Sequence, residues 1–279
     1  MNEMKKSSKT IAFIVLTVLS LAFFSPIVII LMNSFKDKFS ISDSPFSLPS
    51  ADTFTGLDNY ISGIEKTGYW SAFGYTLYIT LLSLAVIVLF DAMTAWYITR
   101  VKSKYSSAIN YLLIFSMVVP FQMVMFTMSK TANMLHIDNP TGIVLLYLGF
   151  GSGMAVFLYS GFIKSIPIDI EEASVIDGCS PIQSFFMVVF PILKPIAITV
   201  AILDAMWIWN DYLMPYLVLD IKSVKTISIA VQYLQGGYGS KDMGAMMAVL
   251  MLTIIPIVVF YLACQKYIIK GIVAGAVKG

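Results

Sequence analysis

Polar side chains inside long apolar stretches are the residues whose types and spacing suggest chemistry in this chain. Asn210 and Asp211 place an amide beside a carboxylate, and aromatic residues flank them. Aromatic faces pack against the C–H faces of sugars, while amide and carboxylate groups bind hydroxyls. The candidates for lining a substrate pathway are Gln122, Trp207, Trp209, Asn210, Asp211 and Tyr212. The alternative is helix packing, which polar and aromatic side chains also mediate within membrane spans.

Two more carboxylates, Asp91 and Asp204, lie within apolar stretches, where a charged group is costly and by default indicates function. For Asp91 we favour a structural role, paired with Arg100 or with a neighbouring helix. The alternative is proton or sodium coupling through Asp91, Asp204 or Asp211, which would make the chain an ion-coupled secondary transporter. The internal inverted repeats that many such transporters carry are not visible in the sequence.

Sequence patterns that would predict catalysis or nucleotide binding are missing. The chain contains no HExxH, GxSxG or GxxxxGK[ST] pattern, so an ATPase would have to be a separate polypeptide. His136 is the one histidine, with no cysteine near it, and does not predict a metal site. Cys179 and Cys264 are far apart and are expected to be unpaired thiols. We expect the chain to be no enzyme and to bind no cofactor.

The composition indicates that lipid surrounds most of the chain. Of 279 residues, 58% are hydrophobic and 12% charged, with mean hydropathy +0.83, whereas soluble domains carry roughly 25% charged residues. The net charge of +2, without a basic patch, gives no reason to expect a nucleic-acid partner.

Apolar runs of about 20 residues are long enough to cross a membrane as helices. We predict six such spans: Ile11–Met32, Ser71–Thr99, Ala108–Met128, Gly142–Phe162, Ile196–Leu219 and Gly244–Cys264. The first run is too long for the apolar region of a cleavable signal peptide. The predicted fold class is an all-α membrane protein.

The distribution of Lys and Arg predicts the orientation of these spans. With the N-terminus inside, the inside segments carry eleven Lys or Arg residues and the outside segments seven. Both termini are therefore predicted to be cytoplasmic. The 33–70 segment is expected to be a turn-rich external loop with a short amphipathic stretch, able to touch an outside partner.

The predicted cytoplasmic loop 164–194 is expected to contain two short helices. Pro167 suits a helix start, and Asp169, Glu171 and Glu172 complement the positive end of the first helix. Gly178 suits the left-handed position that ends a helix.

The second helix of this loop begins with a capping-box pattern, in which Ser180 is followed three residues later by Gln183. Pro191 and Pro195 are expected to break the chain before the fifth span. Helix physics alone leaves open whether this loop binds a partner or merely tucks beneath the helical bundle.

The spacing of residues within the loop resembles the EAA signature of ABC importer permeases, Glu-Ala-Ala-x3-Gly-x9-Ile-x-Leu-Pro. Here Glu172-Ala173-Ser174 is followed by Gly178 and Pro191 at the signature's spacing. The departures are Ser174, Val188 and Phe190, which replace Ala, Ile and Leu.

Two other segments resemble the carbohydrate branch of this family. Trp209–Pro215 reads Trp-Asn-Asp-Tyr-Leu-Met-Pro, close to the Trp-Asn-Asp-Phe-Leu-x-Pro of that branch. The C-terminal Gly-Ala-Val-Lys-Gly, residues 275–279, is similar to the tail of the second permease subunit of maltose-type importers. The resemblance covers essentially the whole chain.

The resemblance implies the type I ABC importer permease fold, with a cytoplasmic coupling helix that docks on an ATPase. It implies three kinds of partner: a second permease subunit, a homodimeric ABC ATPase that binds ATP and Mg, and an external or periplasmic sugar-binding protein. The implied substrates are sugars, di- or oligosaccharides among them, imported across the bacterial inner or plasma membrane. The residues implied to couple to the ATPase are Glu171, Glu172, Ala173, Ser174, Asp177, Gly178, Pro191, Gly275 and Gly279.

The predicted organisation has three parts. Residues 1–70 hold the N-terminal flank, the first span and the external loop. Residues 71–264 form the permease core with loop 164–194, and residues 265–279 form a cytoplasmic tail.

Overall fold

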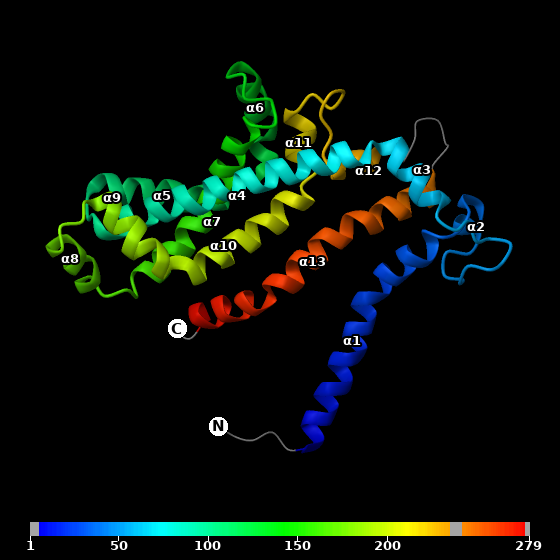
Figure 1. The fold of residues 1–279 in the computed structure, drawn as a ribbon, viewed down its shortest axis with the longest axis horizontal. Helices are drawn as coiled ribbons and strands as arrows, with labels where there is room; N and C mark the ends of the chain where they lie inside the picture. The colour runs from blue at the N-terminus through cyan, green and yellow to red at the C-terminus, as the bar shows by residue number, and fades with distance from the viewer. Residues whose placement is uncertain (1–5, 235–241, 277–279) are drawn as a thin grey trace. The chain divides into compact units, whose positions relative to one another are not determined.

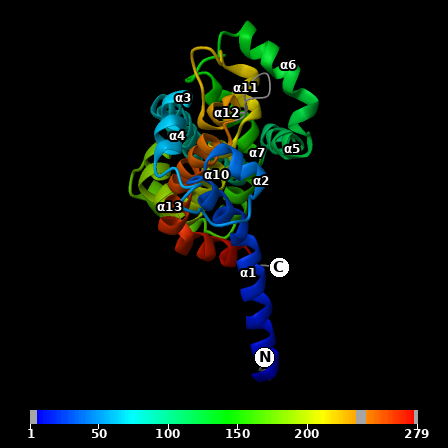
Figure 2. The same cartoon turned by 90° about the vertical axis from the view of Figure 1, so that its right-hand side faces the viewer.

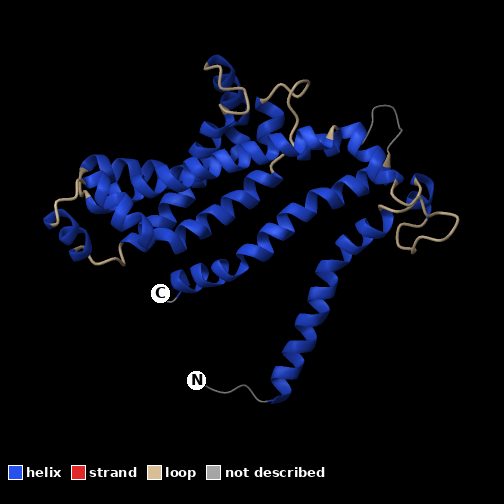
Figure 3. Cartoon of the chain, in the orientation of Figure 1, coloured by secondary structure: helices blue, strands red, loops and turns tan. Residues whose placement is uncertain are grey.

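The chain is helical throughout the part that its computed structural model describes, residues 6–234 and 242–276, with side chains for residues 9–234 and 242–266. No strand occurs in those residues, as Figure 3 shows, and the predicted all-α class is confirmed. The helices are α1 (Lys6–Asn33), α2 (Lys38–Asp43), α3 (Asp58–Thr67), α4 (Tyr69–Arg100), α5 (Lys104–Val118), α6 (Phe121–Met134), α7 (Ile143–Ile163), α8 (Asp169–Ile176), α9 (Pro181–Ser184), the π-helix η1 (Phe185–Val189), α10 (Phe190–Asn210), α11 (Leu213–Val218), α12 (Ile227–Tyr233) and α13 (Met243–Ala276).

The chain divides into two compact units whose helices are labelled in Figure 1. The first unit comprises Met1–Trp70 and Ala230–Pro256, and the second comprises Ser71–Ile229 and Ile257–Gly279. The first unit therefore holds α1, α2, α3 and the start of α13, while α5 to α11 belong to the second. The division into flank, core and tail at residues 70 and 264 stays a prediction.

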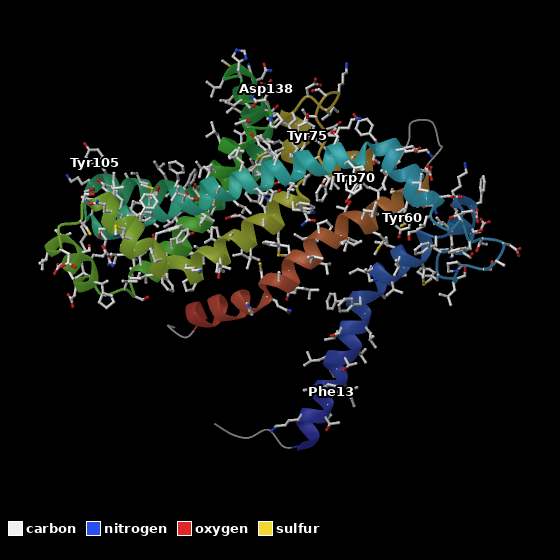
Figure 4. All side chains as sticks on the ribbon, in the orientation of Figure 1. Phe13, Tyr60, Trp70, Tyr75, Tyr105 and Asp138 are labelled. Carbon is white, nitrogen blue, oxygen red and sulfur yellow. The ribbon has the colours of Figure 1, made fainter. Side chains whose placement is uncertain are left out.

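Helix α1 presents apolar side chains along its length. Its apolar window within Lys9–Asn33 contains no buried residue, and Phe13 is 71% exposed (Figure 4). An apolar surface of this size requires lipid or another protein to cover it.

The predicted external loop after α1 is folded in the first unit. The buried Lys36 ammonium donates a hydrogen bond to the Ser44 carbonyl over 2.9 Å. The Asn59 amide on α3 donates to the carbonyls of Ser34 and Lys36 over 2.9 and 2.8 Å. These bonds satisfy backbone carbonyls that have no partner within a helix in this irregular segment. The short helices α2 and α3 replace part of the irregular structure that we predicted.

Helix α3 packs closely on the start of α13 in the same unit. A Cβ atom at Gly63 would lie 2.7 Å from Cγ2 of Val249, so this approach requires glycine. Lys66 forms an ion pair with Asp242 just before α13. Partial burial acts to raise the pKa of Asp242, but hydrogen bonds from Lys66 and from the Ala245 N–H outweigh it and hold the pKa below its ordinary value.

Helix α7 lies at the centre of the second unit, between α5 and α10. Its side chains Tyr147, Tyr159 and Ile163 are fully buried in the apolar core. Gly153 permits close contact with α5, because a Cβ atom there would lie 2.8 Å from the Leu113 carbonyl oxygen. Around α7, the second unit holds α4, α5 and α10 in the arrangement that positions the loop containing α8.

Five helices are long and apolar enough to cross a membrane, and α5 with α6 would supply a sixth span as a bent pair. The third predicted span, Ala108–Met128, is wrong as a straight helix, because α5 and α6 meet at 110° (Figure 2). The bend lies at Val119 and Pro120. Pro120 has no N–H to donate and disfavours helical dihedral angles at Val119, which is extended.

The fifth predicted span is placed too far along the chain, because the helical span runs from Pro181 to Asn210 over 30 residues. The expected break at Pro191 and Pro195 is wrong. Pro195 lies inside α10, and Pro191 follows directly on the π-helical turn η1. Wider turns of this kind accommodate irregular hydrogen bonding within a continuous helix.

Candidate functional site

Helix α8 and its caps form the part of the predicted coupling loop that local sequence rules describe well. Gly178 has φ of +85°, which confirms the left-handed end predicted for the first helix. The capping box is also confirmed: Ser180 Oγ accepts from the Gln183 N–H, and the Gln183 side chain accepts from the Ser180 N–H. The prediction that the second short helix is a separate element is wrong, because α9 continues through η1 into α10.

The two faces of α8 differ in burial. Glu171 and Ser174 are buried, at 8% and 5% exposed, whereas Glu172, Ala173 and Asp177 are exposed. Large apolar side chains accompany the exposed acids: Ile168, Ile170, Val175 and Ile176. The outward face of α8 therefore offers carboxylates and apolar groups together, which suits binding to another protein.

The Glu171 carboxylate anchors the inward face of α8 to the end of α4. Its Oε1 accepts hydrogen bonds from Nε and Nη2 of Arg100 over 2.9 and 2.6 Å, and its Oε2 accepts from Nε1 of Trp96 over 2.8 Å. Arg100 Nη2 also donates to the Ile166 carbonyl over 3.0 Å. The side chains of Arg100 and Glu171 are 18% and 10% exposed. Two guanidinium nitrogens thus bind one carboxylate oxygen, in an ion pair that is largely shielded from water.

Sequence reasoning missed Arg100 and Trp96 as partners of α8 and expected Glu171 to face the ATPase with its neighbours. The available signal was the periodicity of α8: Glu171 and Ser174 are three residues apart and share one helical face. An acid on the buried side of a helix requires a partner. Arg100, at the end of a predicted span on the same membrane side, was a candidate for that role.

A second anchor joins α8 to α9. Ser174 Oγ and Ser184 Oγ are 2.6 Å apart, and Ser174 Oγ also donates to the Glu171 carbonyl. Beside them, the Phe185 ring packs against Trp96 at 5.4 Å between centroids. Helix α8 is thus held both to α4 and to the start of the long helix that continues as α10.

Two of the remaining predicted coupling residues, Pro191 and Gly275, lie in other helices. Pro191 is in the first turn of α10 and lines a mainly apolar cavity with Lys194 and Ala197. Gly275 lies near the end of α13, and Gly279 lies outside the described residues.

Five of the six predicted pathway residues lie at or just after the end of α10, and Gln122 lies in the first turn of α6. Asp211 is extended and ends α10, which corrects its predicted place near the centre of the fifth span. Its Oδ1 accepts from the Leu213 N–H over 3.0 Å and its Oδ2 from the Tyr147 hydroxyl over 3.0 Å. These bonds engage both carboxylate oxygens in starting α11 and joining it to α7, so Asp211 has a structural role. The sequence feature that could have predicted this role is the tendency of an aspartate to accept a hydrogen bond from the backbone N–H two residues later.

The aromatic pathway candidates divide into buried and exposed members. Trp209 is 6% exposed and packs against Phe73, whereas Trp207 is 38% exposed. The Tyr212 and Tyr216 rings stack at 5.1 Å between centroids. Asn210 and Gln122 are both exposed, and the Asn210 amide nitrogen donates to the Met206 carbonyl. The exposed set therefore combines aromatic faces with amide groups.

The buried carboxylates have distinct surroundings. Asp91 Oδ1 accepts from the Ser152 hydroxyl of α7 over 2.7 Å, which confirms a neighbouring helix as its partner. The alternative pairing with Arg100 is wrong, because Arg100 binds Glu171. Asp204 lies against α7 near Gly151. No group of three potential metal ligands occurs among the described residues.

Comparisons with known proteins are consistent across family, sequence and fold. Residues 92–273 match a family described as "Binding-protein-dependent transport system inner membrane component". The probable starch degradation products transport system permease protein AmyC of Thermoanaerobacterium thermosulfurigenes is 41% identical over 261 residues, which are 94% of each chain. The multiple sugar-binding transport system permease protein MsmG of Streptococcus mutans is 35% identical, over 99% of this chain and 100% of that protein.

One solved structure is similar over nearly the full length. It is a bacterial ABC transporter involved in the import of the acidic polysaccharide alginate, with a TM-score of 0.78. The match covers 96% of this chain and 99% of that chain at 21% identity. The similarity shows that the two chains share a fold.

Proposed function

The chain belongs to the family of binding-protein-dependent transport system inner membrane components, and we propose that it supplies half of a sugar translocation pathway. It is a permease subunit of a sugar ABC importer, as are its relatives. An ion-coupled secondary transporter, the alternative from sequence, does not fit this family. The substrate that we propose is a di- or oligosaccharide.

The proposed partners are a second permease subunit, a homodimeric ABC ATPase and an external sugar-binding protein. The family's description names dependence on a binding protein. ATP and Mg belong in this proposal to the ATPase, and the chain itself binds neither. Both termini are proposed to be cytoplasmic, so that α8 faces the ATPase.

The observation that carries the coupling role is the two-sided character of α8. Its inward face is fixed by Glu171 and Ser174, while Glu172 and Asp177 are exposed on its outward side. A helix that is anchored on one side and open on the other transmits the motion of a docked partner instead of absorbing it. We assign the ATPase contact to the exposed residues and the anchoring to Glu171.

The anchors define the route of the motion. Displacing α8 displaces the end of α4 through Arg100 and the end of α9 through Ser184. From Pro181 to Asn210 the span has 30 residues, or roughly 45 Å at the rise of an α-helix. A movement at α8 therefore reaches the Asn210 end of α10 as rigid-body rocking, the motion expected of alternating access.

The proposed pathway residues are the exposed Trp207 and Asn210 at that end, together with the exposed Gln122 in the first turn of α6. Aromatic rings pack against sugar C–H faces, and amide groups exchange hydrogen bonds with hydroxyls. Asp211 supports the site by joining α11 to α7 and does not contact sugar in this proposal.

The test is a charge reversal at the outward face of α8. Glu172→Lys should leave the chain inserted and assembled with the second permease, yet lower ATPase capture and ATP-driven uptake at least tenfold. The control is Asp52→Lys, a charge reversal at an exposed position in the proposed external loop, which should leave ATPase capture unchanged. Unchanged uptake in Glu172→Lys would overturn the coupling assignment.

A further inference from the structure

A cavity of about 700 Å³ lies in the second unit where α4 ends, α5 begins and α7 ends. Its lining includes Lys102, Lys104, Lys164, Ser103, Ser106 and Ser160. In the described part of the chain, no Asp or Glu side chain lines it. The cavity lies near two connections to α8: the end of α7, which precedes α8 in the chain, and the end of α4, which is joined to α8 by the Arg100–Glu171 ion pair.

The charge of this cavity is strongly positive. Lys102, Lys104 and Lys164 are exposed and form no ion pair with a described residue. The neighbouring Arg100 does not add to this charge, because Glu171 neutralises it. Helix α5 starts here with Ser103 as its N-cap, so the positive end of its dipole lies at the cavity. The charge and the dipole both favour an anion.

Hydroxyl groups in the cavity wall lack partners. Ser160 is 9% exposed, and its Oγ makes no hydrogen bond with any described residue. The Thr99 Oγ1, also in the lining, is buried without a described partner. An unpaired buried hydroxyl costs about 1–3 kcal/mol unless a ligand or water binds it. Both oxygens are covered by surrounding atoms, so an oxygen-rich anion such as phosphate is held first by the free lysines and reaches a hydroxyl when the cavity wall shifts.

The surroundings of the cavity favour a phosphate that belongs to a lipid. On α5, Tyr105, Tyr111 and Leu112 are 80%, 71% and 67% exposed, and Tyr111 also lines the cavity. Figure 4 labels Tyr105 at this end of the second unit. Tyrosines gather at the membrane–water interface, and basic pockets between spans bind headgroups. An apolar surface that continues from an anion site fits an acyl chain attached to the anion.

We propose that this cavity binds the phosphate headgroup of an anionic phospholipid, with the acyl chains along α5. Lys102, Lys104 and Lys164 supply the charge, and Ser160 donates a hydrogen bond to a phosphate oxygen. The site is separate from the exposed face of α8 and from the Asn210 end of α10.

The test measures binding of phosphatidylglycerol and phosphatidylcholine to the detergent-purified complex of this chain with its partner subunits, by native mass spectrometry. Lys102→Gln/Lys104→Gln should weaken phosphatidylglycerol binding about 30-fold, since each basic residue near an anionic lipid contributes about fivefold. Ser160→Ala should weaken it about fivefold. Ser160→Ala removes no hydrogen bond within the described protein, so it should fold normally.

The matched control is Lys130→Gln/Lys222→Gln, which removes two exposed lysines elsewhere in the second unit. This variant should bind phosphatidylglycerol as the wild type does. Equal losses in both double variants, or no loss in Lys102→Gln/Lys104→Gln and Ser160→Ala, would overturn the site. A separate arm adds inorganic phosphate at equal concentration. Displacement of phosphatidylglycerol by inorganic phosphate at that concentration would overturn the lipid assignment.

Discussion

Glu171→Ala is the substitution that separates anchoring from docking in α8. It leaves the Arg100 guanidinium without its carboxylate and Trp96 Nε1 without its acceptor. The adjacent Glu172 is exposed and makes no such contacts among the described residues. Glu172→Ala is therefore a matched control that removes the same atoms one position away.

The expected loss follows from the geometry of the pair. Both side chains are less than a fifth exposed, and three hydrogen bonds reach the carboxylate. Removing one partner of a buried ion pair costs about 3–5 kcal/mol, because the other charge stays buried and unpaired. Glu171→Gln retains the shape and an acceptor and should cost about 1–3 kcal/mol. Glu172→Ala should stay within about 0.5 kcal/mol.

The assay compares three quantities in the purified complex: thermal unfolding, ATP hydrolysis and sugar uptake. Glu171→Ala should lower the unfolding temperature and reduce the sugar transported per ATP hydrolysed, because α8 moves without α4. Arg100→Ala should add little to Glu171→Ala, with a coupling energy of about 1.5–3 kcal/mol in the double-mutant cycle. The prediction is refuted if Glu171→Ala is as stable as Glu172→Ala, or if it transports as much sugar per ATP hydrolysed as the wild type.

Three further predictions concern single positions. Gly178→Ala should destabilise the end of α8 by about 1–2 kcal/mol, measured by thermal unfolding, because φ is +85° there although an added Cβ meets nothing within 4 Å. The pKa of Asp242 in the folded chain lies below the ordinary aspartate pKa. Its ion pair with Lys66 therefore stabilises the fold fully at any pH above the ordinary pKa, and this stabilisation is lost as the pH falls through the pKa of the folded chain. Asp242→Asn should therefore lower the unfolding temperature equally at pH 7 and pH 5, and a difference that vanishes at pH 5 would contradict this. Asn210→Leu should reduce uptake at unchanged ATPase capture, and normal uptake would remove Asn210 from the pathway.

Local chemistry made the ends of α8 predictable. The left-handed Gly178 and the Ser180 capping box depend on residues within four positions of one another, and both were confirmed. Long apolar runs likewise predicted α1, α4 and α7 to within a few residues at most ends. Features that depend on neighbouring residues in the chain, or on hydropathy over one helix, can be predicted from the sequence.

Contacts between distant segments were not predictable in this way. Glu171 and Arg100 are 71 residues apart, and no local rule joins them. Proline rules failed in both directions: Pro120 bends a predicted span by 110°, whereas Pro195 sits within a continuous helix. The outcome at each proline depends on how neighbouring turns and helices satisfy the backbone, which tertiary packing decides.

The most direct test of the central claim is uptake of a labelled oligosaccharide into proteoliposomes that contain this chain, the second permease, the ATPase and the binding protein. The account predicts uptake that requires ATP and the ATPase and is unaffected by proton and sodium ionophores. Uptake by this chain without the ATPase, or uptake abolished by those ionophores, would contradict it.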